Sequence, residues 1–127
     1  MSIEKNKAII RKLFEAENKR NLAILDELIA PNFIEGRNTP FELRGPEGYK
    51  QFVTMLFKGF PDWHETIEDI IAEGDKVWVR YRVTGTAPTG KKIELTTVSI
   101  LRIVNGKAVE GWTVPKLVSK EKKLKVT

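Results

Sequence analysis

The sequence predicts an α+β fold in which three helices from the first half of the chain pack on a curved, mainly antiparallel sheet from the second half. Apolar residues recur at helical spacing before Pro61, whereas β-branched and aromatic residues in near alternation follow it. Short turn signals between the later segments are typical of antiparallel hairpins. Helices and strands that are separated in this way along a chain indicate the α+β class.

The first predicted helix covers residues 3–18, and Ser2 is suited to cap its start. Its apolar face consists of Ile3, Ile10, Leu13 and Phe14. A second, shorter helix is predicted over residues 22–30, where Asn21 can cap the start and Pro31 ends the helical pattern.

The third predicted helix has the clearest pattern and begins at Pro46, which suits the first helical position after Gly45. Its apolar stripe consists of Tyr49, Phe52, Val53, Leu56, Phe57 and Phe60. Gly59 and Pro61 end the helix. Before this helix, residues 32–37 are predicted as a brief strand and residues 39–48, which are rich in Pro and Gly, as a loop.

Four further strands are predicted over residues 63–73, 76–86, 92–104 and 107–114. Turns at Gly74–Asp75, at Ala87–Gly90 and at Asn105–Gly106 separate them. A curved sheet wrapped round three helices would leave a hollow on its concave face. Such a hollow is a natural site for a small ligand.

The composition excludes several classes of function. The chain has 127 residues, enough for one domain with its own core, and it has no cysteine. Disulfides, thiol catalysis and cysteine-bound zinc are therefore excluded. No apolar run reaches the roughly 20 residues of a membrane span, and the N-terminus lacks the apolar block of a signal peptide. We expect a cytoplasmic protein without membrane contact.

The net charge of +5 is concentrated at the C-terminus. Residues 116–127 hold five lysines and one glutamate, so the rest of the chain is nearly neutral. A nucleic-acid-binding protein would concentrate basic residues on a folded face. We therefore expect no nucleic-acid partner, and interpret residues 1–118 as a single domain followed by a basic tail over residues 119–127.

The segment DWHETIED, residues 62–69, surrounds the chain's only histidine, His64, with four acids. In a strand His64 and Glu68 share one face while Glu65 and Asp69 share the other, so the acids do not converge. No second histidine is present to complete a metal site, and none is predicted. The pattern favours an exposed edge or the rim of the hollow, where His64 is a candidate acid or base.

Other polar residues are placed near the expected hollow. Glu35 lies in the extended segment before the third helix and is the other candidate catalytic base. Candidates for ligand binding are Arg37, Tyr49, Thr97, Ser99 and Trp112. The hydroxyls of Thr97 and Ser99, which share one strand face, could orient a ligand oxygen or bond within the sheet. Glu35 and Arg37 could form a polar pair that faces the ligand, or a pair on the protein surface.

The strand over residues 76–86 has no face of purely solvent-exposed character. Trp78 alternates with Arg80 and Arg82, and valines and a tyrosine occupy the opposite positions. This pattern indicates that the outer face of the sheet is covered, most simply by a second copy of the chain. We therefore expect a homodimer.

Three stretches of the chain resemble the SnoaL-like polyketide cyclases, or ester cyclases. They are LDELIAPNFIE, RGPEGYKQFVTMLFKGFPDWHETIEDIIAEGDKVWVRYRVTGT and PTGKKIELTTVSILRIVNGKAVEGW, and they follow one another in family order. The resemblance as a whole extends from about residue 6 to 118. The resemblance implies the cystatin-like α+β cone that is shared with ketosteroid isomerase and nuclear transport factor two. It also implies a mostly apolar pocket and no metal or redox cofactor.

Two positions depart from the family pattern. An aspartate–histidine pair of the family corresponds to Glu35 and Gly36, and the acid/base aspartate after the last-strand tryptophan corresponds to Lys116. The resemblance implies proton abstraction beside a carbonyl of a small apolar or polyketide-like molecule, followed by ring closure or isomerisation. The two departures leave open an alternative, a non-catalytic module on the same fold that binds a small molecule or a partner.

Overall fold

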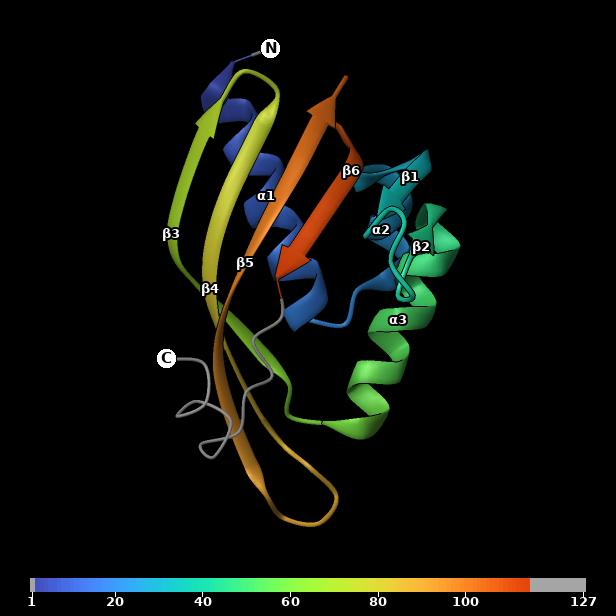
Figure 1. Ribbon diagram of the computed structural model, residues 1–127, viewed down its shortest axis with the longest axis vertical. Helices are drawn as coiled ribbons and strands as arrows, with labels where there is room; N and C mark the ends of the chain where they lie inside the picture. Colours follow the sequence, from blue (N-terminus) through green and yellow to red (C-terminus); the bar gives the residue numbers. More distant parts are fainter. Residues whose placement is uncertain (1, 115–127) are drawn as a thin grey trace.

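The computed structural model describes residues 2–114 and confirms the α+β architecture, with the helices on one side of a six-stranded, mostly antiparallel sheet (Figure 1). The elements are α1 (Ile3–Asn18), the 3₁₀ helix η1 (Leu22–Ile24), α2 (Leu25–Leu28), β1 (Ile29–Glu35), β2 (Leu43–Arg44), α3 (Gly45–Gly59), β3 (His64–Glu73), β4 (Lys76–Thr86), β5 (Lys92–Val104) and β6 (Lys107–Val114). The predicted basic tail and Lys116 lie outside the described residues.

Helix α1 has the predicted bounds because its local signals agree with one another. The Ser2 side chain accepts a hydrogen bond from the Lys5 backbone N–H at 3.1 Å and caps the first turn. Ile10, Leu13 and Phe14 are buried along one face, as their spacing predicts. This face packs the helix across the sheet.

The second helix is shorter than predicted. It consists of η1 followed by the single turn of α2, and the chain is already extended at Ile29. Ile29 pairs with Ala108 of β6 in parallel, and both side chains are fully buried. The prediction of helix as far as Ala30 is wrong because this long-range strand pairing outweighs the local apolar pattern.

The sheet has the strand order β2-β1-β6-β5-β4-β3. Strands β3 to β6 form consecutive antiparallel hairpins, as the turn signals predict. Strand β1 returns to the sheet beside β6 in the only parallel pairing among the described strands, and the two-residue β2 pairs with β1 within the predicted loop. This arrangement brings the end of β1 next to the middle of β6.

A β-bulge in β3 changes which side chains face the helices. The register with β4 shifts between Ile67 and Asp69. Before the shift Glu65 faces inward. After it Ile70 is opposite the buried Val79, and Asp69 is opposite the exposed Arg80. The expectation that Glu65 and Asp69 share a face is therefore wrong.

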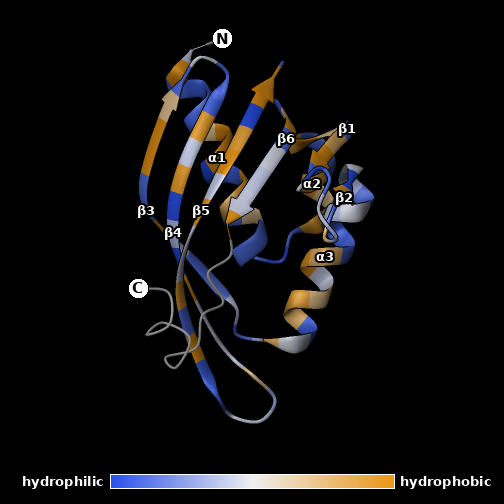
Figure 2. Ribbon diagram, viewed as in Figure 1, coloured by the Kyte–Doolittle hydropathy of each residue, from blue (hydrophilic) through white to orange (hydrophobic). Residues whose placement is uncertain are grey.

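The core lies between the helices and the concave face of the sheet. Hydrophobic and hydrophilic residues alternate along the strands (Figure 2). The largest fully buried side chain is Phe33 of β1, and Phe14 of α1 packs edge-on against Tyr81 of β4 with ring centroids 4.7 Å apart. No helix within residues 2–114 is long and apolar enough to cross a membrane.

Candidate functional site

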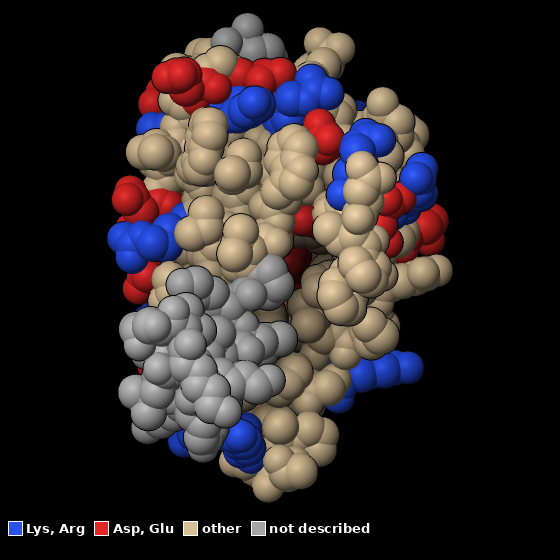
Figure 3. Space-filling view, in the orientation of Figure 1, with Lys and Arg blue, Asp and Glu red and all other residues tan. Residues whose placement is uncertain are grey.

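Acidic and phenolic side chains gather in the interior of the fold. Three carboxyl groups from α1, β1 and β3 lie close enough to two tyrosines from α3 and β4 to affect their ionisation. We call these five residues the interior polar cluster: Glu17, Glu35, Glu65, Tyr49 and Tyr81. Figure 3 shows the surface hollowed between the sheet and the side of the molecule that carries α3, with acidic atoms visible inside the hollow.

Glu35, the last residue of β1, occupies space that any side chain at position 111 would fill. It is opposite Gly111 of β6, and a Cβ built on this glycine would lie 2.5 Å from Glu35 Oε1. Burial raises the pKa of Glu35, and a hydrogen bond with the Thr113 hydroxyl partly opposes the rise. A carboxylate that holds a proton more strongly than usual is suited to general base catalysis.

Glu17 lies in the last turn of α1 and leaves only 7% of its surface exposed. The Tyr49 hydroxyl from α3 donates a hydrogen bond to Glu17 Oε2. Burial raises the pKa of Glu17 well above its ordinary value, and the neighbouring Glu65 carboxylate raises it further. Burial raises the pKa of Tyr49 well above its ordinary value, and the Glu17 and Glu65 carboxylates raise it further. The Tyr49 hydroxyl therefore keeps its proton and acts as a hydrogen-bond donor.

Glu65 differs from the exposed edge or rim predicted for its segment. Strand β3 is an edge strand and His64 is exposed, yet Glu65 is only 8% exposed. Asn18, at the end of α1, donates from Nδ2 to the Glu65 carbonyl at 2.8 Å and accepts from the Glu65 N–H at 2.9 Å. Trp63 Nε1 donates to Glu65 Oε2 at 3.1 Å. The end of α1 therefore covers the inner face of the edge strand at this residue.

A chain of hydroxyl groups runs across three strands towards Glu35. The Tyr81 hydroxyl lies 3.0 Å from Ser99 Oγ, which lies 2.8 Å from Thr113 Oγ1, and Thr113 interacts with Glu35. Buried Thr97 donates instead to the backbone carbonyl of Val114. The hydroxyls of Thr97 and Ser99 therefore both make hydrogen bonds within the sheet.

Three of the sequence-predicted residues lie away from the cluster. His64 is exposed and alternates with the inward-facing Glu65. Arg37 is exposed and pairs with Glu110 at 3.3 Å rather than with Glu35. Trp112 lies between the inward-facing Gly111 and Thr113, so its side chain is on the outer face of the sheet. The structure brings together Glu35, Tyr49 and Ser99.

Gly36, which corresponds to the histidine of the family pair, has a backbone unsuited to a side chain. Its φ is +67°, and an added Cβ would lie 3.0 Å from Thr39 Oγ1. The Thr39 N–H donates to the Gly36 carbonyl at 3.0 Å, which closes a tight turn directly after β1. The turn accounts for glycine at this position in physical terms.

Sequence reasoning missed Glu17 and Tyr81, although each carried a signal. Glu17 falls on the same helical face as Ile10, Leu13 and Phe14, so its charge interrupts an apolar stripe. Tyr81 lies on the inward face of β4, on the same side of the strand as the buried valines at positions 77, 79 and 83. Glu17 and Tyr81 could have been identified by this pattern, in which a polar side chain occupies a position on an otherwise apolar, buried face.

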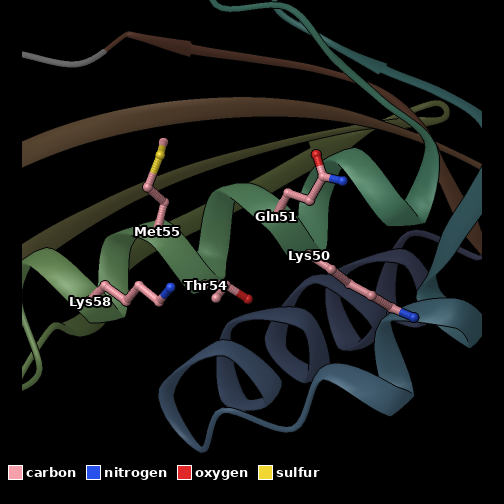
Figure 4. Close-up of a pocket in the computed structure, with 5 residues that line it drawn as sticks. All are labelled: Lys50, Gln51, Thr54, Met55 and Lys58. Carbon is pink, nitrogen blue, oxygen red and sulfur yellow. The ribbon is translucent and has the colours of Figure 1, made fainter.

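Two other hollows lie along the outer side of α3. The first, of about 320 Å³, is lined by Lys50, Gln51, Thr54, Met55 and Lys58, and Figure 4 shows these side chains spread along the helix in different directions. The second, of about 500 Å³, is lined by Glu42, Leu43, Arg44, Gly48, Gln51, Phe52 and Met55. Neither lining includes a residue of the interior polar cluster. Within residues 2–114 no three metal-ligating side chains are placed to hold an ion.

Helices packed on one side of a bent, mainly antiparallel six-stranded sheet place the chain in the class of α+β cone proteins. The family model for the SnoaL-like polyketide cyclases matches residues 7–124, which is most of the chain. The chain belongs to the SnoaL-like polyketide cyclase family, as its sequence resemblance predicts.

Solved structures agree with this assignment. IdmH from Streptomyces antibioticus, a candidate polyketide cyclase, is 31% identical with a TM-score of 0.80, and the match covers 94% of this chain and 98% of that one. AclR from Streptomyces galilaeus, a candidate hydroxylase, is 28% identical with a TM-score of 0.77 over 89% and 90% of the two chains. A SnoaL-like polyketide cyclase from Agrobacterium tumefaciens, 17% identical with a TM-score of 0.82 over 98% and 99%, shares the fold. No curated protein matches the chain.

Proposed function

We propose that the chain is a cofactor-independent acid–base catalyst. It removes a proton beside a carbonyl of a small, mostly apolar, polyketide-like molecule, and ring closure or isomerisation follows. The observation that supports this most directly is the Glu35 carboxylate, which lies inside the fold against Gly111 with its pKa raised by burial. A base is most effective when its pKa lies near the working pH.

Neighbouring groups support the second requirement of this chemistry, a donor for the oxygen of the enolate. The hydroxyls of Tyr81, Ser99 and Thr113 form a connected chain that ends at Glu35. Burial raises the pKa of Tyr81, so this group keeps its proton at neutral pH. Donors that are already fixed in position stabilise a developing oxyanion without reorganisation.

Replacing Glu35 by glutamine tests the proposal, because glutamine keeps the shape but cannot accept the proton. The probe is α-tetralone, an apolar bicyclic ketone, whose α-hydrogen exchange in D₂O is followed by proton NMR. We expect Glu35→Gln to slow the catalysed exchange about 10²- to 10⁴-fold. Gly111→Ala should also slow it, because the new Cβ displaces Glu35 Oε1.

The matched control is Glu94→Gln, an exposed acid that pairs with Arg82 at 3.0 Å. This variant should exchange α-tetralone at the wild-type rate. Wild-type exchange in the Glu35→Gln variant would show that another group is the base.

One observation favours a second candidate function, a small-molecule-binding module without catalysis. The backbone at Gly36 has a φ of +67°, which would strain the histidine that the family pattern places beside the acid. Binding without catalysis predicts that α-tetralone raises the melting temperature of the wild-type chain, while its α-hydrogens exchange no faster than in buffer.

We also propose that the outer face of the sheet pairs with a second copy of the chain. One row of opposed residues crosses β3 to β6: Ile71, Trp78, Ile100 and Trp112. Ile71 is 60% exposed and Trp112 is 36% exposed, which is unusual for large apolar side chains in one patch. Uncharged side chains cover this front face, and charged ones flank it at the top and left (Figure 3).

The charges beside this row favour a copy of the chain as the occupant. Arg80 pairs with Glu68 at 3.2 Å and Arg82 with Glu94 at 3.0 Å, so their charges are balanced within the chain. An apolar row with balanced margins is complementary to itself, which a two-fold interface requires.

We expect Trp112→Glu to halve the molar mass measured by light scattering after gel filtration, because it buries an unpaired charge in the proposed interface. Phe41→Glu, at a loop residue that is 82% exposed, should leave the mass unchanged. A wild-type mass equal to that of one chain would contradict the dimer.

A further inference from the structure

The carboxyl group of Glu65 is buried, so water does not supply the hydrogen bonds that its oxygens can accept. Trp63 donates to Oε2, but Oε1 is buried and has no hydrogen-bond partner among the described residues. The two hydrogen bonds from Asn18 fix the backbone of the same residue, so the side chain cannot swing outward with its strand. A buried, unpaired acceptor costs about 1–3 kcal/mol unless a donor reaches it.

Glu17 is the group that can provide this donor. Its carboxyl interacts directly with that of Glu65, and its Oε2 already accepts from Tyr49. The titratable groups with the largest effects on the pKa of Glu17 are Glu65 on β3, Tyr49 on α3 and Glu35 on β1, and none of these three is a cation. Two carboxylates in contact without a cation share a proton rather than both ionise.

We propose that Glu17 and Glu65 hold one proton between them at neutral pH, and that Glu17 is the general acid opposite the general base Glu35. This inference rests on the proposed function and names a second catalytic residue for it. Contacts place the two acids in one interior: Glu35 is two residues from Phe33, whose ring packs edge-on against Tyr49 at 5.8 Å between centroids, and Tyr49 binds Glu17.

The proton transfers balance over one catalytic cycle. Glu35 takes the α-proton, the C–H electron pair forms the C=C bond of the enol, and the carbonyl π pair moves to oxygen, which takes the proton from Glu17. The Glu17–Glu65 pair is then doubly negative, and this repulsion favours return of the proton. When the carbonyl re-forms, the enol O–H proton returns to Glu17 and Glu35 delivers its proton to carbon, so both acids regain their starting states.

Glu17→Gln separates this role from a structural one. A glutamine side chain can accept from Tyr49 through its oxygen and donate to Glu65 through its nitrogen, so it reproduces the hydrogen bonds of a neutral Glu17. It cannot transfer a proton to the enolate oxygen. We expect the variant to fold, to keep the KM for α-tetralone within about threefold, and to lose about 10²-fold or more in kcat for α-hydrogen exchange.

Infrared spectroscopy provides a readout that does not depend on activity. The wild-type chain at neutral pH should show the C=O stretch of a protonated carboxyl group, and Glu17→Gln should abolish it. Glu15→Gln, an exposed acid on the same helix, should leave both the band and the exchange rate unchanged. An unchanged band, or a kcat for Glu17→Gln within threefold of the wild-type value, would overturn the inference.

The two proposals fail in different ways. Loss of exchange in Glu35→Gln together with normal exchange in Glu17→Gln leaves the proposed function intact and removes Glu17 from it. Normal exchange in Glu35→Gln together with its loss in Glu17→Gln reverses the assignment of the base and overturns the pairing proposed here.

Discussion

Replacing Phe33 by alanine is expected to lower the free energy of unfolding by about 3–5 kcal/mol, the usual cost of truncating a fully buried phenylalanine. Phe33 is 0% exposed in β1, its ring packs against Tyr49, and its Cζ lies 3.5 Å from the position of a Cβ on Gly111. The resulting cavity would lie beside the interior polar cluster. Urea titration followed by tryptophan fluorescence should show a lower midpoint with an unchanged slope.

Phe41→Ala is the matched control, since it removes the same side chain from a residue that is 82% exposed. Its effect should stay within about 0.5 kcal/mol, as for most surface substitutions. Equal losses in the two variants would contradict the central position of Phe33 in the core.

Stability is expected to fall as the pH rises above the ordinary carboxyl pKa. The pKa values of Glu17, Glu35 and Glu65 are all raised from 4.5 in the folded chain, chiefly by burial. Below pH 4.5 these carboxyl groups are protonated in both the folded and the unfolded chain, and their full contribution to the stability of the folded chain is present. Between 4.5 and the raised values the folded chain binds more protons than the unfolded chain, so the free energy of unfolding decreases with rising pH. The slope is about 1.4 kcal/mol per pH unit for each extra proton.

Urea titrations at a series of pH values measure this slope. Burial and the Glu65 carboxylate together raise the pKa of Glu17, and Glu17→Gln removes this titrating group. The free energy of unfolding of the variant should therefore fall less steeply with rising pH than that of the wild-type chain. Glu15→Gln, which lies on the same helix but is exposed, should keep the wild-type slope. Stability that rises through this interval would be the behaviour of ion-paired carboxylates and would contradict the burial of these acids without cations.

Much of the fold could be predicted because each segment carries its own pattern. The capping residue Ser2 and the turn Asn105–Gly106 act over a few residues, and the elements beside them have the predicted bounds. The end of the second helix could not be predicted in this way. Ile29 is extended because it pairs with Ala108, and nothing near Ile29 in the sequence indicates that partner.

The candidate site was predictable in part. Glu35, Tyr49 and Ser99 could be selected because residue type, together with the strand pattern for Glu35 and Ser99 and the helical stripe for Tyr49, placed them near the concave face. Glu65 appeared to belong to a solvent-exposed edge, since a strand pattern does not show that α1 covers it. The bulge in β3, which separates Asp69 from the face of Glu65, left no clear local signal either.

By itself the sequence determined the α+β class, the family and most helix and strand bounds, because periodicity, caps and turns are properties of neighbouring residues. The tertiary structure alone decided which acids are removed from water and which of them meet. Desolvation depends on segments that are distant along the chain: α1 covers Glu65, α3 supplies Tyr49 to Glu17, and Gly111 of β6 makes room for Glu35. The acid–base chemistry that we propose for this protein depends on those contacts.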